Sequence, residues 1–339
     1  MSVTPFSFAA GASNHESAAL VSQPAALEAA NRGFAFDMAR ALASRPRSIS
    51  PKYFYDARGS QLFDAICELP EYYPTRTELA ILRTHAKEIA EQMGPCAEIV
   101  EFGAGSCVKV ALLLDAMERP ASYLPIDISG EHLAASAAEL RERYPALDVQ
   151  PVIADYTQRL LLPARVPGAG QRVGFFPGST IGNFTPAEAL HFLQVAGQVL
   201  RGGALLLGAD LIKEPEVLHA AYNDAQGVTA AFNLNLLVRA NCELGTDFVL
   251  GQFAHSAFYN APAQRIEMHL VSRCRQQVTL AGEVHGFEEG ETLHTENSAK
   301  FTIEGLRALA ERAGFRAGPV WTDPQRMFSL QWLHAPSNS

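Results

Sequence analysis

The sequence of 339 residues is poor in basic residues and contains no long apolar run. Lysine and arginine total 27 against 36 aspartates and glutamates, so the formal charge is −9. Nucleic-acid-binding proteins normally carry a basic surface, and we expect no nucleic-acid partner. A membrane-spanning helix needs about 18 or more apolar residues, whereas the longest apolar stretch, 204–212, is interrupted by Asp210. We therefore expect no membrane partner either.

Cysteine is also scarce, and its spacing matches no metal or redox motif. The five cysteines are Cys67, Cys96, Cys107, Cys242 and Cys274. They form no C-x-x-C pair, and none has a histidine at metal-ligand spacing, which is typical of free thiols in a reducing compartment. No basic residue precedes Arg32, so the charged start of a secretory signal is absent. We predict a cytoplasmic protein that uses no metal, and we expect a monomer.

Alternating short strands and helices begin near residue 97. The predicted strands are 98–102, 122–128, 149–153, 172–177 and 204–209, and the helices among them are 108–117, 130–144 and 186–200. This order is typical of an α/β fold with a doubly wound, Rossmann-like parallel sheet. Right-handed crossovers place the carboxyl ends of parallel strands at one edge, where we expect the functional site.

Residues 213–290 break this alternation and predict an inserted domain. A helical stretch at 215–244 precedes two alternating segments, 248–258 and 264–279, which favour a β-hairpin. We interpret the block as an α+β substrate-binding insertion. The predicted parts of the chain are a flexible N-terminal arm (1–30), an N-terminal helical part of the substrate-binding domain (31–76), a Rossmann-like cofactor-binding domain (77–212), the insertion (213–300) and a C-terminal helix with closing strands (301–339).

The two ends of the chain carry further predicted elements. The N-terminal part predicts helices at 31–43 and 60–69, then a loop at 71–75 and a helix at 77–93 capped by Thr77. Near the C-terminus we predict a helix at 302–313 and a pair of strands within 315–334.

A glycine turn after the first predicted strand indicates a nucleoside cofactor. Gly103 and Gly105 let the backbone approach a ligand closely. Val108 stands where the third glycine of a dinucleotide fingerprint belongs, so that fingerprint is incomplete. S-adenosylmethionine has no pyrophosphate and needs only a close backbone and a carboxylate for its ribose. The turn therefore favours S-adenosylmethionine over a nicotinamide cofactor.

Polar residues at the next strand ends support this interpretation. Asp127 lies 24 residues beyond Gly103, near the interval of about 20 residues expected for an acid that binds ribose. Asp155 and Tyr156 follow the third strand, where an adenine edge would lie. Lys109 is either a solvated lysine or a cofactor contact. Each feature alone is often a turn or a helix cap, but three in order at successive strand ends indicate an adenosyl cofactor.

Four longer strings carry a family resemblance. Residues 53–60 (YFYDARGS), 69–78 (LPEYYPTRTE), 178–183 (GSTIGN) and 227–233 (GVTAAFN) resemble the histidine-specific Nα-methyltransferases of ergothioneine biosynthesis. The resemblance spans about residues 46–335. It implies a class I methyltransferase fold and S-adenosylmethionine-dependent trimethylation of the α-amine of L-histidine, which gives hercynine.

The resemblance also implies roles for individual residues. The cofactor would be held by Gly103, Lys109, Asp127, Asp155 and Tyr156. Histidine would be held by Tyr73, Gly178, Asn183, Tyr222, Met268, Glu296 and Ser298. One departure from the family pattern is Asn297, where an apolar residue is expected. In extended chain its side chain points away from those of Glu296 and Ser298.

The chemistry of methyl transfer agrees with these residue types. An in-line displacement needs an oriented neutral amine, and much of the acceleration comes from orientation. Glu296 can accept an imidazole N–H, and Ser298 shares its face in an extended strand. Asn183 and Tyr222 can donate to the substrate carboxylate. Tyr55 can attract the methylated ammonium through its ring, so we name Tyr55 and Asn183 as the catalytic candidates.

Each candidate also has a purely structural interpretation. Tyr73, Tyr222 and Met268 fit ordinary core packing, and Asn183 fits support of the glycine turn. Glu296 lies four residues before Lys300, as in an exposed helical ion pair. The scattered histidines show no orienting acid, and we interpret them as structural or solvated.

Three rival functions stay open at this point. The nearest is a related N-methyltransferase acting on a tryptophan-type amino acid, for which a glutamate–serine pair has no use. A nicotinamide oxidoreductase is disfavoured by Val108. A binding protein without catalysis is the third.

Overall fold

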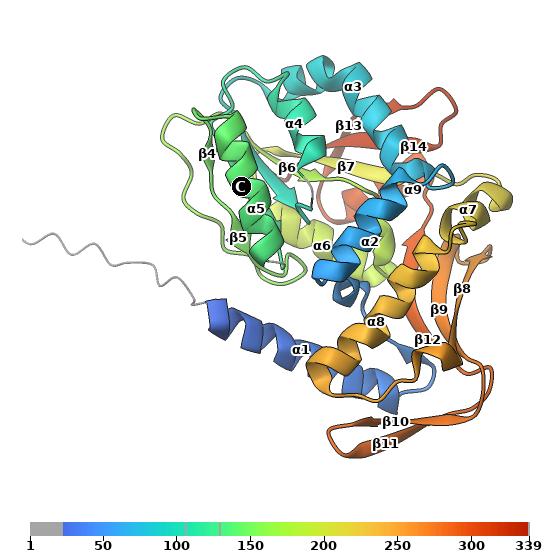
Figure 1. Ribbon diagram of the computed structural model, residues 1–339. Helices are drawn as coiled ribbons and strands as arrows, with labels where there is room; N and C mark the ends of the chain where they lie inside the picture. Colours follow the sequence, from blue (N-terminus) through green and yellow to red (C-terminus); the bar gives the residue numbers. More distant parts are fainter. Residues whose placement is uncertain (1–22, 106, 129, 338–339) are drawn as a thin grey trace, which may run out of the picture.

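The computed structural model describes residues 23–105, 107–128 and 130–337. Its larger sheet has eight strands in the order β13-β14-β7-β6-β2-β3-β4, with β5 also paired to β3 (Figure 1). The strands are β2 (Glu98–Phe102), β3 (Ser122–Asp127), β4 (Asp148–Val149), β5 (Val152–Ile153), β6 (Arg172–Phe176), β7 (Ala204–Asp210), β13 (Arg316–Thr322) and β14 (Phe328–His334). The neighbouring strands β4, β3, β2, β6 and β7 run parallel to one another, and β14 runs antiparallel to both its neighbours, β7 and β13. This is the doubly wound class I methyltransferase sheet that the sequence predicts.

Helices cover both faces of this sheet. One face packs against α3 (Tyr73–Met93), α4 (Val108–Leu114) and α5 (Gly130–Arg143), and the other against α6 (Pro186–Val199) and α9 (Ile303–Arg312). Successive strand residues therefore enter different cores: Ile99 lies in the first and Val100 in the second, both fully buried. Burial on both faces explains why the parallel strands read as continuous apolar runs.

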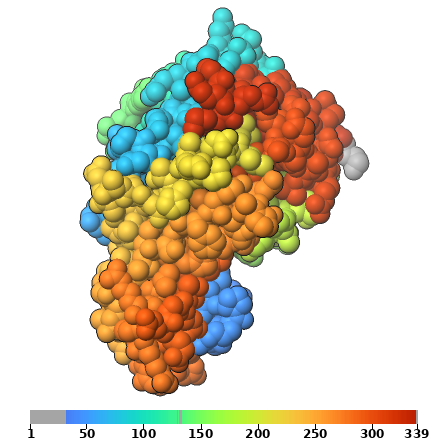
Figure 2. All heavy atoms as spheres, turned by 90° about the vertical axis from the view of Figure 1, so that its right-hand side faces the viewer, coloured from blue at the N-terminus to red at the C-terminus, as the bar shows by residue number. Residues whose placement is uncertain are grey.

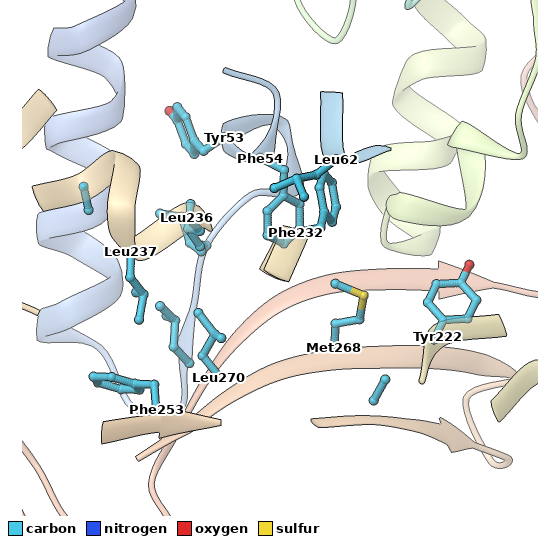
Figure 3. Close-up of a cluster of buried hydrophobic side chains, with 14 of the residues drawn as sticks. Tyr53, Phe54, Leu62, Tyr222, Phe232, Leu236, Leu237, Phe253, Met268 and Leu270 are labelled. Carbon is cyan, nitrogen blue, oxygen red and sulfur yellow. The ribbon is translucent and has the colours of Figure 1, made fainter. Parts of the chain in front are cut away.

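A second sheet has four strands in the order β1-β12-β9-β8. These are β1 (Arg47–Ser48), β12 (Thr292–Ala299), β9 (Arg265–Ser272) and β8 (Phe253–Asn260). Their apolar face shares one core with α1 (Gln23–Ala43), α2 (Ala57–Glu68), α7 (Pro215–Tyr222) and α8 (Val228–Leu244). Figure 3 shows part of this core, and Figure 2 shows residues 213–300 (yellow to orange) as a lobe with α1 (blue) beside it. Segments from the N-terminus and from the insertion thus build one unit.

Short elements complete the described chain. They are the 3-10 helices η1 (Pro51–Phe54), η2 (Thr180–Asn183) and η3 (Leu250–Gln252) and the separate hairpin of β10 (Gln276–Leu280) and β11 (Glu283–Phe287). All five cysteines are free, as expected. Among the described residues, no helix combines the length and apolarity needed to cross a bilayer.

The structure corrects several predicted boundaries at the N-terminal end. The first helix starts at Gln23 rather than at residue 31, and residues 1–22 of the predicted arm lie outside the described residues. The predicted loop at 71–75 is partly helical, because α3 begins at Tyr73 and not at residue 77. Pro74 lies in its first turn, where a helix needs no N–H donor from that residue.

Other corrections concern the strands and the insertion. The third strand is split into β4 and β5 around Pro151, which has no N–H for the sheet ladder. The long helical stretch at 215–244 is two helices. Gly227 adopts a left-handed φ of 73° between them, and the Asp224 carboxylate accepts the N–H groups of Val228 and Thr229 at 2.8 Å each. The predicted hairpin starts only at Phe253 and its second strand ends at Ser272, because residues 276–280 pair with β11.

Candidate active site

The glycine turn after β2 lies against an aromatic ring from the end of the third strand. Gly103 has φ 72°, and its N–H and that of Ala104 both donate to the carbonyl of Ile126 on β3. A Cβ atom at Gly103 would lie 3.5 Å from the Tyr156 ring. A side chain there would be strained by its positive φ and would lie against this ring. The structure thus brings the predicted turn and Tyr156 together.

Asp127 and Asp155 follow adjacent strands, as the sequence predicts. Asp127 is the last residue of β3, whose neighbour β5 ends two residues before Asp155. The Asp155 carboxylate accepts from the Thr157 hydroxyl and N–H at 2.5 and 3.0 Å, and from Lys52 at 3.3 Å. Burial raises the pKa of Asp155, but these hydrogen bonds and the Lys52 charge outweigh it and lower the pKa. Lys52 belongs to η1, so the N-terminal part of the chain reaches the predicted cofactor site. The sequence did not predict this contact of Lys52.

Lys109 is held by an unpredicted partner, Glu78 of α3. The Lys109 ammonium lies 2.6 Å from Glu78 Oε2, and Glu78 is fully buried. Both oxygens of this carboxylate also accept the N–H of Gly178, at 3.0 and 2.9 Å. A Cβ atom at Gly208 would lie 2.3 Å from Glu78 Oε1, so only glycine leaves room for this carboxylate. Through Glu78, Lys109 of α4 is therefore linked to the glycine turn after β6.

Asn183 ends η2, which lies directly against the end of β12. A Cβ atom at Gly182 would meet the backbone oxygen and nitrogen of Ala299 at 2.9 and 3.1 Å. This close approach brings the turn that carries Asn183 next to Ser298. The structure therefore packs η2, which follows β6 of the large sheet, against β12 of the second sheet.

Glu296, Ser298 and Tyr222 also come together, as predicted. Tyr222 ends α7, and its hydroxyl donates to Ser298 Oγ at 2.7 Å. Met268 is the strand partner of Glu296 and is buried; in Figure 3 it lies between Phe232 and Tyr222. Burial raises the pKa of Glu296 to about 7, against the opposing charge of Lys300. Glu296 lies in strand β12 and Lys300 is buried, so the alternative of an exposed helical ion pair between them is wrong.

Tyr55 lies between the two halves of the site. Burial raises the pKa of its hydroxyl well above the ordinary value, and the charges of Glu296 and Asp127 both add to the shift. Its ring meets Phe63 and Phe232 edge-on at centroid distances of 5.6 and 5.8 Å. Tyr55 is thus close to Glu296 of the predicted histidine site and to Asp127 of the predicted cofactor site.

The two tyrosines of the LPEYYPTRTE string face different partners. The Tyr73 hydroxyl donates to Asp210 Oδ2 at 2.6 Å and accepts from Lys213 at 2.7 Å. Its neighbour Tyr72, which the sequence did not single out, packs edge-on to Tyr222 at 6.3 Å. Burial raises the pKa of Tyr72, and the charge of Glu296 contributes. The structure therefore directs the hydroxyl of Tyr73 to Asp210 and packs the ring of Tyr72 against Tyr222.

One group of described side chains has the donor set of a metal site. Potential ligand atoms of Glu267, His269 and His294 lie within 4.8 Å of one another on strands β9 and β12. The Glu267 carboxylate already accepts from Arg265 and Asn260, at 2.8 and 2.9 Å. Glu267 thus forms an ion pair with Arg265 on the outer face of the second sheet.

Comparisons with known proteins identify the family of this chain. A family model described as histidine-specific, S-adenosylmethionine-dependent methyltransferase matches residues 34–335. The histidine N-alpha-methyltransferase of Mycolicibacterium smegmatis is 44% identical over 87% of this chain and 92% of its own length. The Mycobacterium tuberculosis protein of the same name is 39% identical with the same coverage.

More distant matches include another amine methyltransferase. The 4-dimethylallyltryptophan N-methyltransferase of Claviceps purpurea is 28% identical over 54% of this chain and 57% of its own. Among solved structures, the CcbJ methyltransferase from Streptomyces caelestis covers 75% of this chain and 95% of its own, with 14% identity and a TM-score of 0.44. On the family match, which spans nearly the whole described chain, this protein belongs to the histidine-specific, S-adenosylmethionine-dependent methyltransferases.

Proposed function

We propose that this chain transfers three methyl groups in succession from S-adenosylmethionine to the α-amine of L-histidine, which gives hercynine. The observation that carries the proposal is that Glu296, a half-buried glutamate whose pKa is raised to about 7, is two residues from Ser298 on the same strand, and that Ser298 accepts the Tyr222 hydroxyl. A carboxylate and a hydroxyl on one strand face can bind the two ring nitrogens of imidazole. The names of the two mycobacterial relatives support the same substrate.

The cofactor assignment rests on the chemistry of the strand ends. We propose that Gly103 provides the close backbone surface, that Asp127 accepts the ribose hydroxyls, and that Asp155 and Tyr156 lie at the adenine edge. Lys109, fixed by Glu78 at 2.6 Å, would face the methionine part. When bound, S-adenosylmethionine supplies an electrophilic methyl group.

For histidine, we propose that Glu296 accepts one imidazole N–H and Ser298 binds the other ring nitrogen. Met268 and Gly178 would line the ring and the amino acid backbone, and Asn183 would bind the carboxylate. The Tyr222 hydroxyl gives its one hydrogen to Ser298, so we propose that Tyr222 holds this serine at the ring rather than binding the carboxylate, which the sequence suggested. The Tyr73 hydroxyl donates to Asp210 Oδ2, so we propose that Tyr73 positions the Asp210 side chain. Tyr72 then takes the direct place beside Glu296.

Tyr55 would act on the amine through its neutral hydroxyl and its ring. Its raised pKa keeps the phenol protonated near neutral pH, so it orients the amine and does not act as a phenolate base. The ring also attracts the growing positive charge of the methylated ammonium. An α-amine has a pKa near 8 in model peptides, so water can take its proton before each transfer.

The decisive experiment is mass spectrometry of L-histidine incubated with S-adenosylmethionine and the enzyme. We expect a mass gain of three methyl groups on histidine and none on tryptophan. Methylation of tryptophan in its place would support the rival substrate, and Glu296→Ala would then leave activity unchanged. We further propose a monomeric, cytoplasmic enzyme that needs no metal, so activity should survive treatment with a chelator.

A further inference from the structure

Lys300 lies beneath the proposed histidine site without an assigned role. It directly follows β12, and its side chain is fully buried. Its ammonium lies 2.7 Å from Ser298 Oγ, 3.3 Å from the Tyr222 hydroxyl and 2.8 Å from Asp210 Oδ2. An ammonium has three hydrogens and no acceptor. All three hydrogens of Lys300 therefore have a partner, and two of these partners are hydroxyls of the proposed histidine site, Ser298 and Tyr222.

Two lysines share the Asp210 carboxylate, but only Lys300 touches these hydroxyls. Lys213 contacts Asp210 Oδ1 and Tyr73. Burial disfavours the charged form of Lys300, yet Asp210 outweighs it and raises the pKa. Burial dominates at Lys213 and lowers its pKa to about 8. Lys300 is thus the permanent cation of the cluster, and Lys213 is available as a matched control.

The hydrogen bonds fix which way the serine hydroxyl points. Ser298 Oγ accepts from Lys300 and also from the Tyr222 hydroxyl, at 2.7 Å each. A serine oxygen has two acceptor positions and one hydrogen, so both acceptor positions are filled. The single hydrogen of Ser298 is left to donate to a ligand.

We propose that Lys300 is a specificity-determining positioning residue that holds Ser298 as a hydrogen-bond donor opposite the acceptor Glu296. A donor and an acceptor together bind a neutral imidazole in one tautomer, with its N–H directed to Glu296 and its bare nitrogen to Ser298. An indole or phenyl ring has no bare nitrogen and leaves the serine unpaired. This assignment rests on the proposed function and adds to it the residue that sets the polarity of the ring site.

A double-mutant cycle with purified enzyme tests the assignment, because Lys300 should act through Ser298. We expect Lys300→Met to raise the KM for histidine about 10- to 100-fold, as for loss of a charge-assisted hydrogen bond. In a Ser298→Ala background the same substitution should cost less than about threefold, since the coupling is gone. Lys213→Met should leave the KM for histidine within about threefold of wild type. Calorimetric affinity for S-adenosylmethionine should be unchanged in every variant.

Lys300→Gln serves if Lys300→Met does not fold, because an amide keeps a donor for Ser298 and should restore part of the affinity for histidine. Equal losses from Lys300→Met with and without Ser298 would overturn the assignment. So would an equal KM rise in Lys213→Met, which would mean that Asp210 pairing alone matters. Failure of the wild-type enzyme to methylate histidine would instead overturn the proposed function, and the assignment with it.

Discussion

At the scale of the residue, Glu296 is a half-buried carboxylate whose surroundings favour its neutral form. Burial raises its pKa to about 7, so ionisation falls within the range of ordinary assays. The ionised form accepts an imidazole N–H through either oxygen, whereas the protonated form has lost much of that capacity. Activity with histidine should therefore depend on pH in part through this group, in addition to the titration of histidine itself.

The first prediction concerns this titration. Below pH 7 the Glu296 carboxylate takes up a proton, so kcat/KM for histidine should fall. Glu296→Gln keeps an acceptor oxygen and does not titrate. The ratio of wild-type to variant kcat/KM cancels the titration of free histidine, and it should fall by up to about tenfold per pH unit below 7. A ratio that is flat between pH 5.5 and 8.5 would contradict a role for Glu296 in binding the ring.

The second prediction separates charge balance from ligand binding at Lys109. Lys109→Met leaves the buried Glu78 carboxylate without its cation, which typically costs about 3–5 kcal/mol of unfolding free energy. Adding Glu78→Gln removes the unpaired charge and should recover most of that stability. Affinity for S-adenosylmethionine should stay reduced in the double variant. The measurements are thermal unfolding and calorimetric titration, and full recovery of affinity would reduce Lys109 to a structural partner of Glu78.

At the scale of the element, a β-bulge in strand β12 sets which face of the sheet its later residues occupy. Leu293 pairs with Leu270 on the buried face, but after the register shift Glu296 pairs with Met268 and Ser298 with Ile266, again on the buried face. Thr295 is the extra residue. A bulge changes which face the following residues occupy. Without it, strict alternation from Leu293 would turn Glu296 and Ser298 outward.

Asn233 of α8 holds this bulge. Its Oδ1 accepts the Thr295 hydroxyl at 2.8 Å, and its Nδ2 donates to the carbonyl of His269 at 3.1 Å. The residue is fully buried. It ends the string GVTAAFN, which signals the family without revealing this function.

The third prediction follows from these two hydrogen bonds of Asn233. Asn233→Ala should raise the KM for histidine about tenfold and lower the unfolding free energy by about 1–3 kcal/mol, because it leaves buried partners unpaired. The affinity for S-adenosylmethionine should not change. Asn223→Ala on the preceding loop is the control, since within the described part of the chain its amide donates to the carbonyls of His219 and Ala257 and not to β12. If both variants bind histidine equally well, the bulge does not need Asn233.

At the scale of the whole molecule, a single core joins the N-terminal helices to the insertion. Phe232 of α8 lies in its centre, with ring centroids of Phe54, Tyr55 and Phe63 at 4.6, 5.8 and 6.0 Å. The cofactor half has separate cores on the two faces of the large sheet. Damage to the first core should therefore reach the histidine site before it reaches the cofactor site.

The fourth prediction tests this division. Phe232→Ala should destabilise the protein by about 3–5 kcal/mol, as for other buried phenylalanines, and weaken histidine binding more than S-adenosylmethionine binding. Phe258→Ala removes a ring that is 43% exposed and should change neither. Denaturant unfolding and the two titrations provide the measurements. Equal weakening of both ligands by Phe232→Ala would mean that the two halves respond as one unit.

The sequence by itself determined the parallel sheet, the order of its strands along the chain and the residues at its carboxyl edge. These follow from local patterns: apolar runs, glycine turns and acids at strand ends. It also indicated that Glu296 and Ser298 share a face, because residues two apart in a strand do so. The family strings pointed to the substrate, although they assigned nothing to Tyr72, Glu78, Asn233 or Lys300.

Only the tertiary structure decided which face of β12 meets the substrate and which cations lie beneath it. A bulge changes the parity of a strand through its pairing with another strand, and no local pattern records that pairing. Lys109 pairs with Glu78, which is 31 residues away in the chain, and Lys300 pairs with Asp210, which is 90 residues away. Burial then sets the protonation of these groups, because the cost of desolvating a charge depends on everything packed around it.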